Sequence, residues 1–211
     1  MDQEISDKPV YSQNVIEFVT VANEYCKFVE NTSRFSKKDF LLKAQSLLPL
    51  LYLKAVILPS FESINDQENE KFVDELTWNH VFNAVKTKLG YHDDYPEVFD
   101  PLTKEQEMMS SASLSDNFAD IYQEIKNLLS LFSIGNEEMM NDGIWECKMN
   151  FEEFWGQKLV NALRAIHIVL SSNDSLDDED ENNETSEDAD MDDIDTSSWI
   201  LSKKQSDYNE E

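Results

Sequence analysis

Three acidic side chains recur at four-residue intervals near the middle of the chain: Asp116, Asp120 and Glu124. Residues four apart share one face of a helix, so a helix here would place the three carboxylates in a row. Such a row could hold a divalent cation, and Asp116 and Asp120 could then serve a metal-assisted hydrolase. Acids in the first turns of a helix also complement its positive N-terminal end. We favour this second, structural interpretation and keep the metal site as an alternative.

Aromatic side chains gather around Gly156. Phe154 and Trp155 are adjacent, and successive residues of a helix point about 100° apart. The two rings therefore cannot face the same neighbour, although a bulky core explains most of this cluster. Gly156 would let another backbone approach closely. We expect a groove for a partner protein at Phe154, Trp155 and Gly156.

The C-terminal segment 171–211 contains sixteen acids and two lysines, and residues 171–195 contain no Lys, Arg or aromatic side chain. So polar a segment buries too little apolar surface to offset its ordering entropy, and we expect it to be disordered. Within 194–204, Trp199, Ile200 and Leu201 precede two lysines. A short apolar cluster beyond an acidic spacer is typical of a docking motif, and a purely solubilising tail is the alternative.

Other catalytic patterns are absent from the sequence. The three histidines, His80, His92 and His167, do not have the spacing of a zinc site, and there is no phosphate-binding glycine loop. Cys26 and Cys147 fall on apolar stripes, where burial makes a thiol inert. We expect no catalytic residue and no cofactor, which favours a protein that is not an enzyme.

Net charge restricts the partners. The chain carries −27, of which −14 belongs to residues 171–211 and −13 to residues 1–170. Phosphate contacts require clustered Lys and Arg, so we expect no binding to nucleic acid. A nucleic-acid-mimicking inhibitor, whose carboxylates take the place of phosphates, is a further alternative. The most apolar run, Leu47–Leu58, is shorter than the roughly 20 residues of a membrane span, so we expect a soluble cytoplasmic protein.

Periodicity predicts an all-α fold: a single-domain helical bundle of about five to seven helices over residues 1–170, followed by the tail 171–211. Pro49 should kink or split the second helix. Ser36 and Ser113 begin capping-box patterns, and Gly90 and Gly135 end helices. The expected helices cover residues 10–31, 36–58, 71–89, 113–134 and 137–170, with a loop at 60–70 and irregular structure at 91–102.

Several stretches resemble one family. SLSDNFADIYQEIKNLL and WECKMNFEEFWGQKLVNALRAIH, together with LLPLLYLKAVILP and DYPEVFDP, are similar to the uncharacterised bacterial family DUF5063. This family tends to have a second Asp and a His where this chain has Asn117 and Phe154. The resemblance implies a helical domain and no particular activity. The positions that carry it are Asp116, Asp120, Ile121, Tyr122, Trp145, Trp155, Gly156 and His167.

Together these features favour a non-enzymatic protein-interaction module that uses an acidic helical surface and its tail. Its net charge predicts a basic partner, whose encounter with the protein would weaken as salt is added. The oligomeric state does not follow from the sequence.

Overall fold

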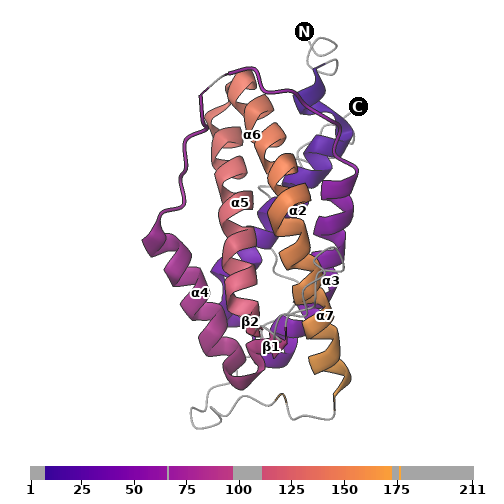
Figure 1. Ribbon diagram of the computed structural model, residues 1–211, viewed down its shortest axis with the longest axis vertical. Helices are drawn as coiled ribbons and strands as arrows, with labels where there is room; N and C mark the ends of the chain where they lie inside the picture. The colour runs from indigo at the N-terminus through magenta and orange to yellow at the C-terminus, as the bar shows by residue number, and fades with distance from the viewer. Residues whose placement is uncertain (1–7, 66, 97–110, 173–175, 177–211) are drawn as a thin grey trace, which may run out of the picture. The chain divides into compact units, whose positions relative to one another are not determined.

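The computed structural model describes residues 8–65, 67–96, 111–172 and residue 176. The predicted disorder of the tail and its docking motif at 194–204 lie outside these residues. Six α-helices lie within them, in agreement with the predicted all-α bundle (Figure 1). Their bounds are α2 (Gln13–Glu30), α3 (Lys37–Val56), α4 (Glu75–Leu89), α5 (Leu114–Ile134), α6 (Glu137–Asn150) and α7 (Gly156–Ser171). Shorter helical segments are η1 (Pro9–Tyr11), η2 (Thr32–Arg34), η3 (Gly90–His92) and the π-helical turn η4 (Phe151–Trp155).

Helix α5 is the centre of the packing. It contacts α2, α4, α6 and α7, and α3 packs against α2 and α7 (Figure 1). The aromatic core lies where α2, α3 and α5 meet: the ring centroids of Phe28 and Phe40 are 4.7 Å apart, and those of Phe40 and Phe118 are 5.4 Å apart. Buried Tyr25 donates a hydrogen bond from its hydroxyl to the carbonyl of Phe118 at 2.9 Å. Within the described residues, no helix is long and apolar enough to cross a bilayer.

The predicted helix ends are confirmed where they depend on local chemistry. Ser36 Oγ accepts a hydrogen bond from the backbone N–H of Asp39, and Ser113 Oγ accepts one from the N–H of Asp116. Both side chains satisfy a donor that the first turn leaves unpaired. Gly90 follows α4 with φ of 58°, and Gly135 follows α5 with φ of 80°, a region that favours glycine.

Helix bounds differ from the expected ones at two places. Helix α3 runs unbroken through Pro49, so the helix is not split there. Its buried side packs along α2 and α7, which outweighs the roughly 3 kcal/mol that an internal proline costs. Helix α4 begins at Glu75, because residues 71–74 are extended and Asp74 caps the helix with its side chain.

The predicted long helix over residues 137–170 is α6, η4 and α7 in continuous succession. The π turn ends immediately before Gly156. A Cβ at Gly156 would collide with the carbonyl oxygen of Phe151, so glycine is required at the end of the π turn. Two three-residue strands, β1 (Asp94–Pro96) and β2 (Ser111–Ser113), pair antiparallel and were not predicted.

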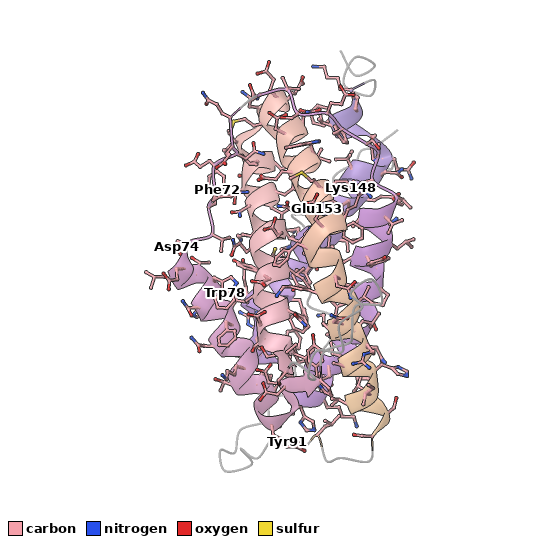
Figure 2. The ribbon with its side chains drawn as sticks, in the orientation of Figure 1. Phe72, Asp74, Trp78, Tyr91, Lys148 and Glu153 are labelled. Carbon is pink, nitrogen blue, oxygen red and sulfur yellow. The ribbon has the colours of Figure 1, made fainter. Side chains whose placement is uncertain are left out.

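Between α3 and α4, residues 58–65 and 67–74 form a strap along α5 and α6, and we call these residues the strap. Asp142 on α6 accepts hydrogen bonds from the backbone N–H of Ile64 at 2.7 Å and of Asn65 at 3.0 Å. Asn127 on α5 accepts from the N–H of Phe72 at 2.8 Å and of Val73 at 3.0 Å. Figure 2 labels Phe72 near the end of the strap, just before α4. Side chains of the helices thus accept the backbone hydrogen bonds that a helix or strand would otherwise have satisfied.

Candidate functional site

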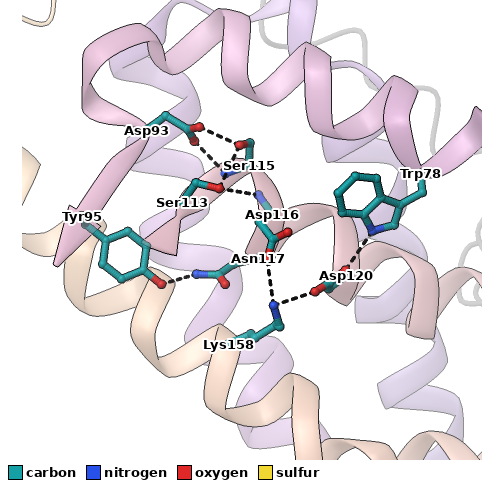
Figure 3. A network of polar contacts seen from close by, with 9 residues as sticks. All are labelled: Trp78, Asp93, Tyr95, Ser113, Ser115, Asp116, Asn117, Asp120 and Lys158. Carbon is teal, nitrogen blue, oxygen red and sulfur yellow. Dashed lines mark hydrogen bonds and ion pairs between the residues drawn. The ribbon is translucent and has the colours of Figure 1, made fainter. Parts of the chain in front are cut away.

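The predicted acidic row binds a lysine. Lys158 Nζ on α7 lies 2.8 Å from Asp116 Oδ2 and 2.6 Å from Asp120 Oδ2 (Figure 3). The other oxygen of Asp120 accepts a 2.8 Å hydrogen bond from the indole N–H of Trp78 on α4. Glu124 continues the row and accepts a hydrogen bond from Asn150. The row therefore links α5 to α4, to α7 and to the end of α6.

The charge on Lys158 is stabilised by this geometry. Partial burial lowers the pKa of Lys158, but the hydrogen bonds from its ammonium group to Asp116 and Asp120 outweigh burial and raise the pKa above its ordinary value. An ammonium group thus occupies the position between the two carboxylates that a cation would need. Among the described residues, no group of three or more His, Cys, Asp or Glu side chains is arranged to hold a metal ion.

The same end of α5 also anchors the short hairpin. Asp93 accepts hydrogen bonds from both the backbone N–H and the hydroxyl of Ser115, at 2.7 and 2.6 Å (Figure 3). Asn117, where the resembled family tends to have Asp, donates from its side-chain amide to the hydroxyl of Tyr95. These contacts are buried or partly buried, and they fix β1 against the first turn of α5.

The three residues of the predicted aromatic groove differ in their exposure to solvent. Trp155 is fully buried and donates its indole N–H to the carbonyl of Cys147 at 3.0 Å, and Gly156 is also buried. Phe154 is 44% exposed, and Lys158 Nζ lies 5.1 Å from its ring centroid. The two adjacent rings do point apart, and of the three residues only Phe154 presents its side chain to solvent. Trp199, Ile200 and Leu201 lie outside the described residues.

The remaining reactive side chains, two cysteines and three histidines, belong to five different elements. Cys26 and Cys147 are both buried, and burial raises the pKa of each thiol above its ordinary range. His80 is exposed on α4, while His92 is buried. His167, on α7, lies with Nδ1 3.4 Å from Gln45 Nε2 of α3.

Helix α3 carries an apolar face that periodicity did not single out. We define the α3 surface as the outward stripe Leu42, Pro49, Leu50, Leu53, Val56 and Ile57. Its five large apolar side chains are each between 38% and 53% exposed. Offsets of 7, 8, 11, 14 and 15 residues from the first member keep them on one side of a helix with 3.6 residues per turn. The opposite side of α3 is buried, so the helix is apolar on both faces.

A group of basic side chains adjoins one end of this stripe. Lys38 precedes Leu42 by one helical turn, and Arg34 and Lys43 lie within a few residues; we call these three the basic cluster. All three are exposed. Within the described part of the chain, none of them forms an ion pair with a carboxylate. Ion pairs are formed there by Lys8, Lys27, Lys54, Lys71, Lys126, Lys148 and Lys158.

Comparisons with known proteins identify relatives of the folded domain. A family model described as a domain of unknown function, DUF5063, matches residues 9–172. The crystal structure of protein BF1032 from Bacteroides fragilis is similar to the chain, with 38% sequence identity and a TM-score of 0.71. The similarity covers 80% of this chain and 98% of the Bacteroides chain. A search of curated proteins found no match.

Proposed function

The chain belongs to the DUF5063 family, and we propose that it is a protein-interaction module whose binding site is the α3 surface. The observation that carries this proposal is the exposure of five large apolar side chains in one line along one helix. Single exposed apolar residues are ordinary, whereas contiguous ones mark interaction sites. Burial of such area contributes about 25 cal/mol per Å² before the costs of association.

Side chains of neighbouring helices fix the C-terminal end of α3, the helix that presents this surface. Lys148 Nζ donates to the carbonyls of Ala55 at 2.9 Å and Val56 at 3.2 Å, and Asn14 donates to the carbonyl of Ile57 at 3.2 Å. These bonds satisfy acceptors that the last turn of a helix leaves unpaired. Because the helix is fixed before binding, little of the interaction energy would be lost to ordering it, which favours a binding role.

The family's matched region also supports a role located in the folded domain. The matched residues 9–172 contain all of α3 and its supports on α2, α6 and α7. The interaction would therefore belong to the domain that the Bacteroides protein shares.

Affinity capture with paired variants tests the proposal. Leu53 is 53% exposed on α3, and Leu76 is 80% exposed on α4, which packs against α5 (Figure 1). We expect Leu53→Gln to reduce recovery of a stoichiometric partner at least tenfold and Leu76→Gln to leave it unchanged, with both variants folded by circular dichroism. Equal recovery by the wild type and Leu53→Gln would contradict the assignment of the α3 surface.

A further inference from the structure

We infer that the occupant of the α3 surface is an acidic segment of a partner protein that carries a short apolar cluster. This inference rests on the proposed function and names the chemistry of the partner. It depends on three features of the described residues: the local charge, the position of that charge relative to the apolar stripe, and the state of the neighbouring carboxylates.

The local charge is opposite to that of the whole protein. The basic cluster brings together three exposed basic side chains with a single acid, Asp39, among them, in a chain of net charge −27. The single acid, Asp39, belongs to the helix cap, where its carboxylate accepts a 2.7 Å hydrogen bond from the hydroxyl of Ser36. Net charge alone predicts a basic partner, whereas the field next to the α3 surface favours an acidic one.

Two carboxylates on elements that adjoin α3 are already paired with lysines. Glu17 on α2 lies 2.6 Å from Lys54 Nζ, and Glu152 on η4 lies 3.5 Å from Lys148 Nζ. Each of these pairs is close to neutral. The basic cluster, which forms no ion pair within the described residues, is therefore the unbalanced charge beside the stripe. The electrostatic energy of the basic cluster is lowered by acids of a partner and raised by further basic side chains.

The order of the two features sets the partner's pattern. Lys38 lies in the first turn of α3 and Ile57 directly follows its last residue, so the nineteen residues between them correspond to about 28 Å at 1.5 Å per residue. Lys38 and Lys43 lie in the first two turns of α3 and Arg34 lies just before the helix, in η2. The exposed apolar side chains follow from Leu42 to Ile57. A complementary segment would place acids at one end and apolar anchors at the other, over nine extended residues or about five helical turns.

A second copy of the chain fits this surface less well. Two molecules that each carry −27 repel one another, and an antiparallel pair of α3 helices would set each basic cluster against an uncharged apolar stretch. An acidic partner segment instead sets its carboxylates directly against the basic cluster, where the short-range attraction is screened less than the repulsion from more distant charges of the chain.

A labelled peptide with the sequence SEDADMDDIDTSSWILS tests the inference against the full-length chain. Its sequence is that of residues 186–202, with six acids followed by Trp, Ile and Leu, the pattern that the surface requires. The full-length chain is therefore used with Trp199, Ile200 and Leu201 changed to Ala, so that its own copy of the segment does not compete with the peptide. We expect saturable binding by fluorescence anisotropy. Lys38→Glu with Lys43→Glu, or Leu53→Gln, should weaken binding at least tenfold, and raising salt from 50 to 500 mM should weaken it comparably.

Matched controls separate charge from apolar contact. Lys8→Glu and Leu76→Gln change the same residue types elsewhere and should leave the affinity unchanged; Lys8 is 2.7 Å from Glu137 on α6. A peptide with Ala in place of Trp, Ile and Leu, and one with Asn and Gln in place of the acids, should each bind at least tenfold more weakly.

Three results would overturn the inference, and each can be told apart from a failure of the α3 surface as a binding site. Absence of peptide binding, with partner capture still lost in Leu53→Gln, would keep the site and reject the acidic partner. A dimer in sedimentation equilibrium that Leu53→Gln dissociates would make the occupant a second copy. A carbodiimide cross-link from Lys38 or Lys43 to a carboxylate of the same chain would show that the chain itself fills the surface.

Discussion

Lys158 on α7 is held 2.6 Å from Asp120 on α5, and the same carboxylate accepts the indole N–H of Trp78 from α4. One side chain thus joins three helices, whereas Asp116 in the same row bonds through its side chain, among the described residues, only to Lys158 on α7. The side chain of Asp120 is 18% exposed and that of Asp116 is 43% exposed. The two acids should therefore differ in their contribution to stability.

We predict that Asp120→Ala lowers the free energy of unfolding by about 2–3 kcal/mol, because it leaves the indole N–H of Trp78 without its acceptor and the partly buried ammonium of Lys158 with one carboxylate instead of two. Asp116→Ala should cost less than about 1 kcal/mol, as is usual for exposed ion pairs. Urea denaturation of both variants measures this difference. Similar losses for the two would contradict the role assigned to Asp120.

The position of Lys158 also predicts how the protein responds to metal ions. Since its ammonium group lies between Asp116 and Asp120, Mg²⁺ and Mn²⁺ should produce no binding heat and no rise in Tm for the wild type. Isothermal titration calorimetry on Lys158→Met, which removes the competing charge, provides the comparison. Binding to the wild type that Asp120→Asn abolishes would revive the metal-assisted hydrolase alternative.

Asn127 is predicted to hold the strap through its oxygen alone. Its Oδ1 accepts the backbone N–H groups of Phe72 and Val73, while its buried Nδ2 has no hydrogen-bond partner among the described residues. Asn127→Leu should lower the unfolding free energy by about 2–4 kcal/mol, because two backbone donors lose their acceptor. Asn127→Asp keeps the acceptor and should cost less. An equal loss for both in urea denaturation would count against the strap geometry.

Asp142 should make stability sensitive to acid. Burial raises the pKa of Asp142, but hydrogen bonds from the backbone of Ile64 and from Asn141 and Asn65 outweigh it and bring the pKa below the ordinary value of 3.8. The unfolded chain therefore takes up a proton at this site more readily than the folded protein. The stabilisation is complete above the ordinary value and is lost as pH falls through the lower, folded one.

Comparison of the wild type with Asp142→Asn tests this sign. The difference in unfolding free energy should be constant from about pH 5 upward and should shrink below about pH 4. A difference that grows toward acid pH would be the opposite of what the hydrogen bonds require.

Sequence patterns predicted what depends on neighbours along the chain. The caps at Ser36 and Ser113 involve residues three apart, and the buried stripes through Phe18 and Ile121 follow from helical period. Sequence patterns gave the wrong structure where the hydrogen-bond partners are distant in sequence. Phe72 and Val73 looked helical by spacing, but Asn127, more than fifty residues away, holds their backbone in an extended form.

The candidate site was hidden for the same reason. In α3 both the buried stripe and the α3 surface are apolar, so periodicity identifies a core face and cannot say which second face stays exposed. The packing of α2 and α7 on one side decides it. The spacing of Asp116 and Asp120 correctly predicted that they share one helical face. The lysine that pairs with both lies about forty residues away on α7, so the spacing could not reveal it.

Photo-cross-linking in the native host tests the central claim most directly. A benzophenone side chain placed at position 53 projects from the middle of the α3 surface, and one placed at position 76 projects from α4 and serves as the control. We predict a discrete protein adduct from position 53 and none from position 76. Adducts of the same identity and yield from both positions, or from position 76 alone, would contradict the assignment of the α3 surface as the binding site.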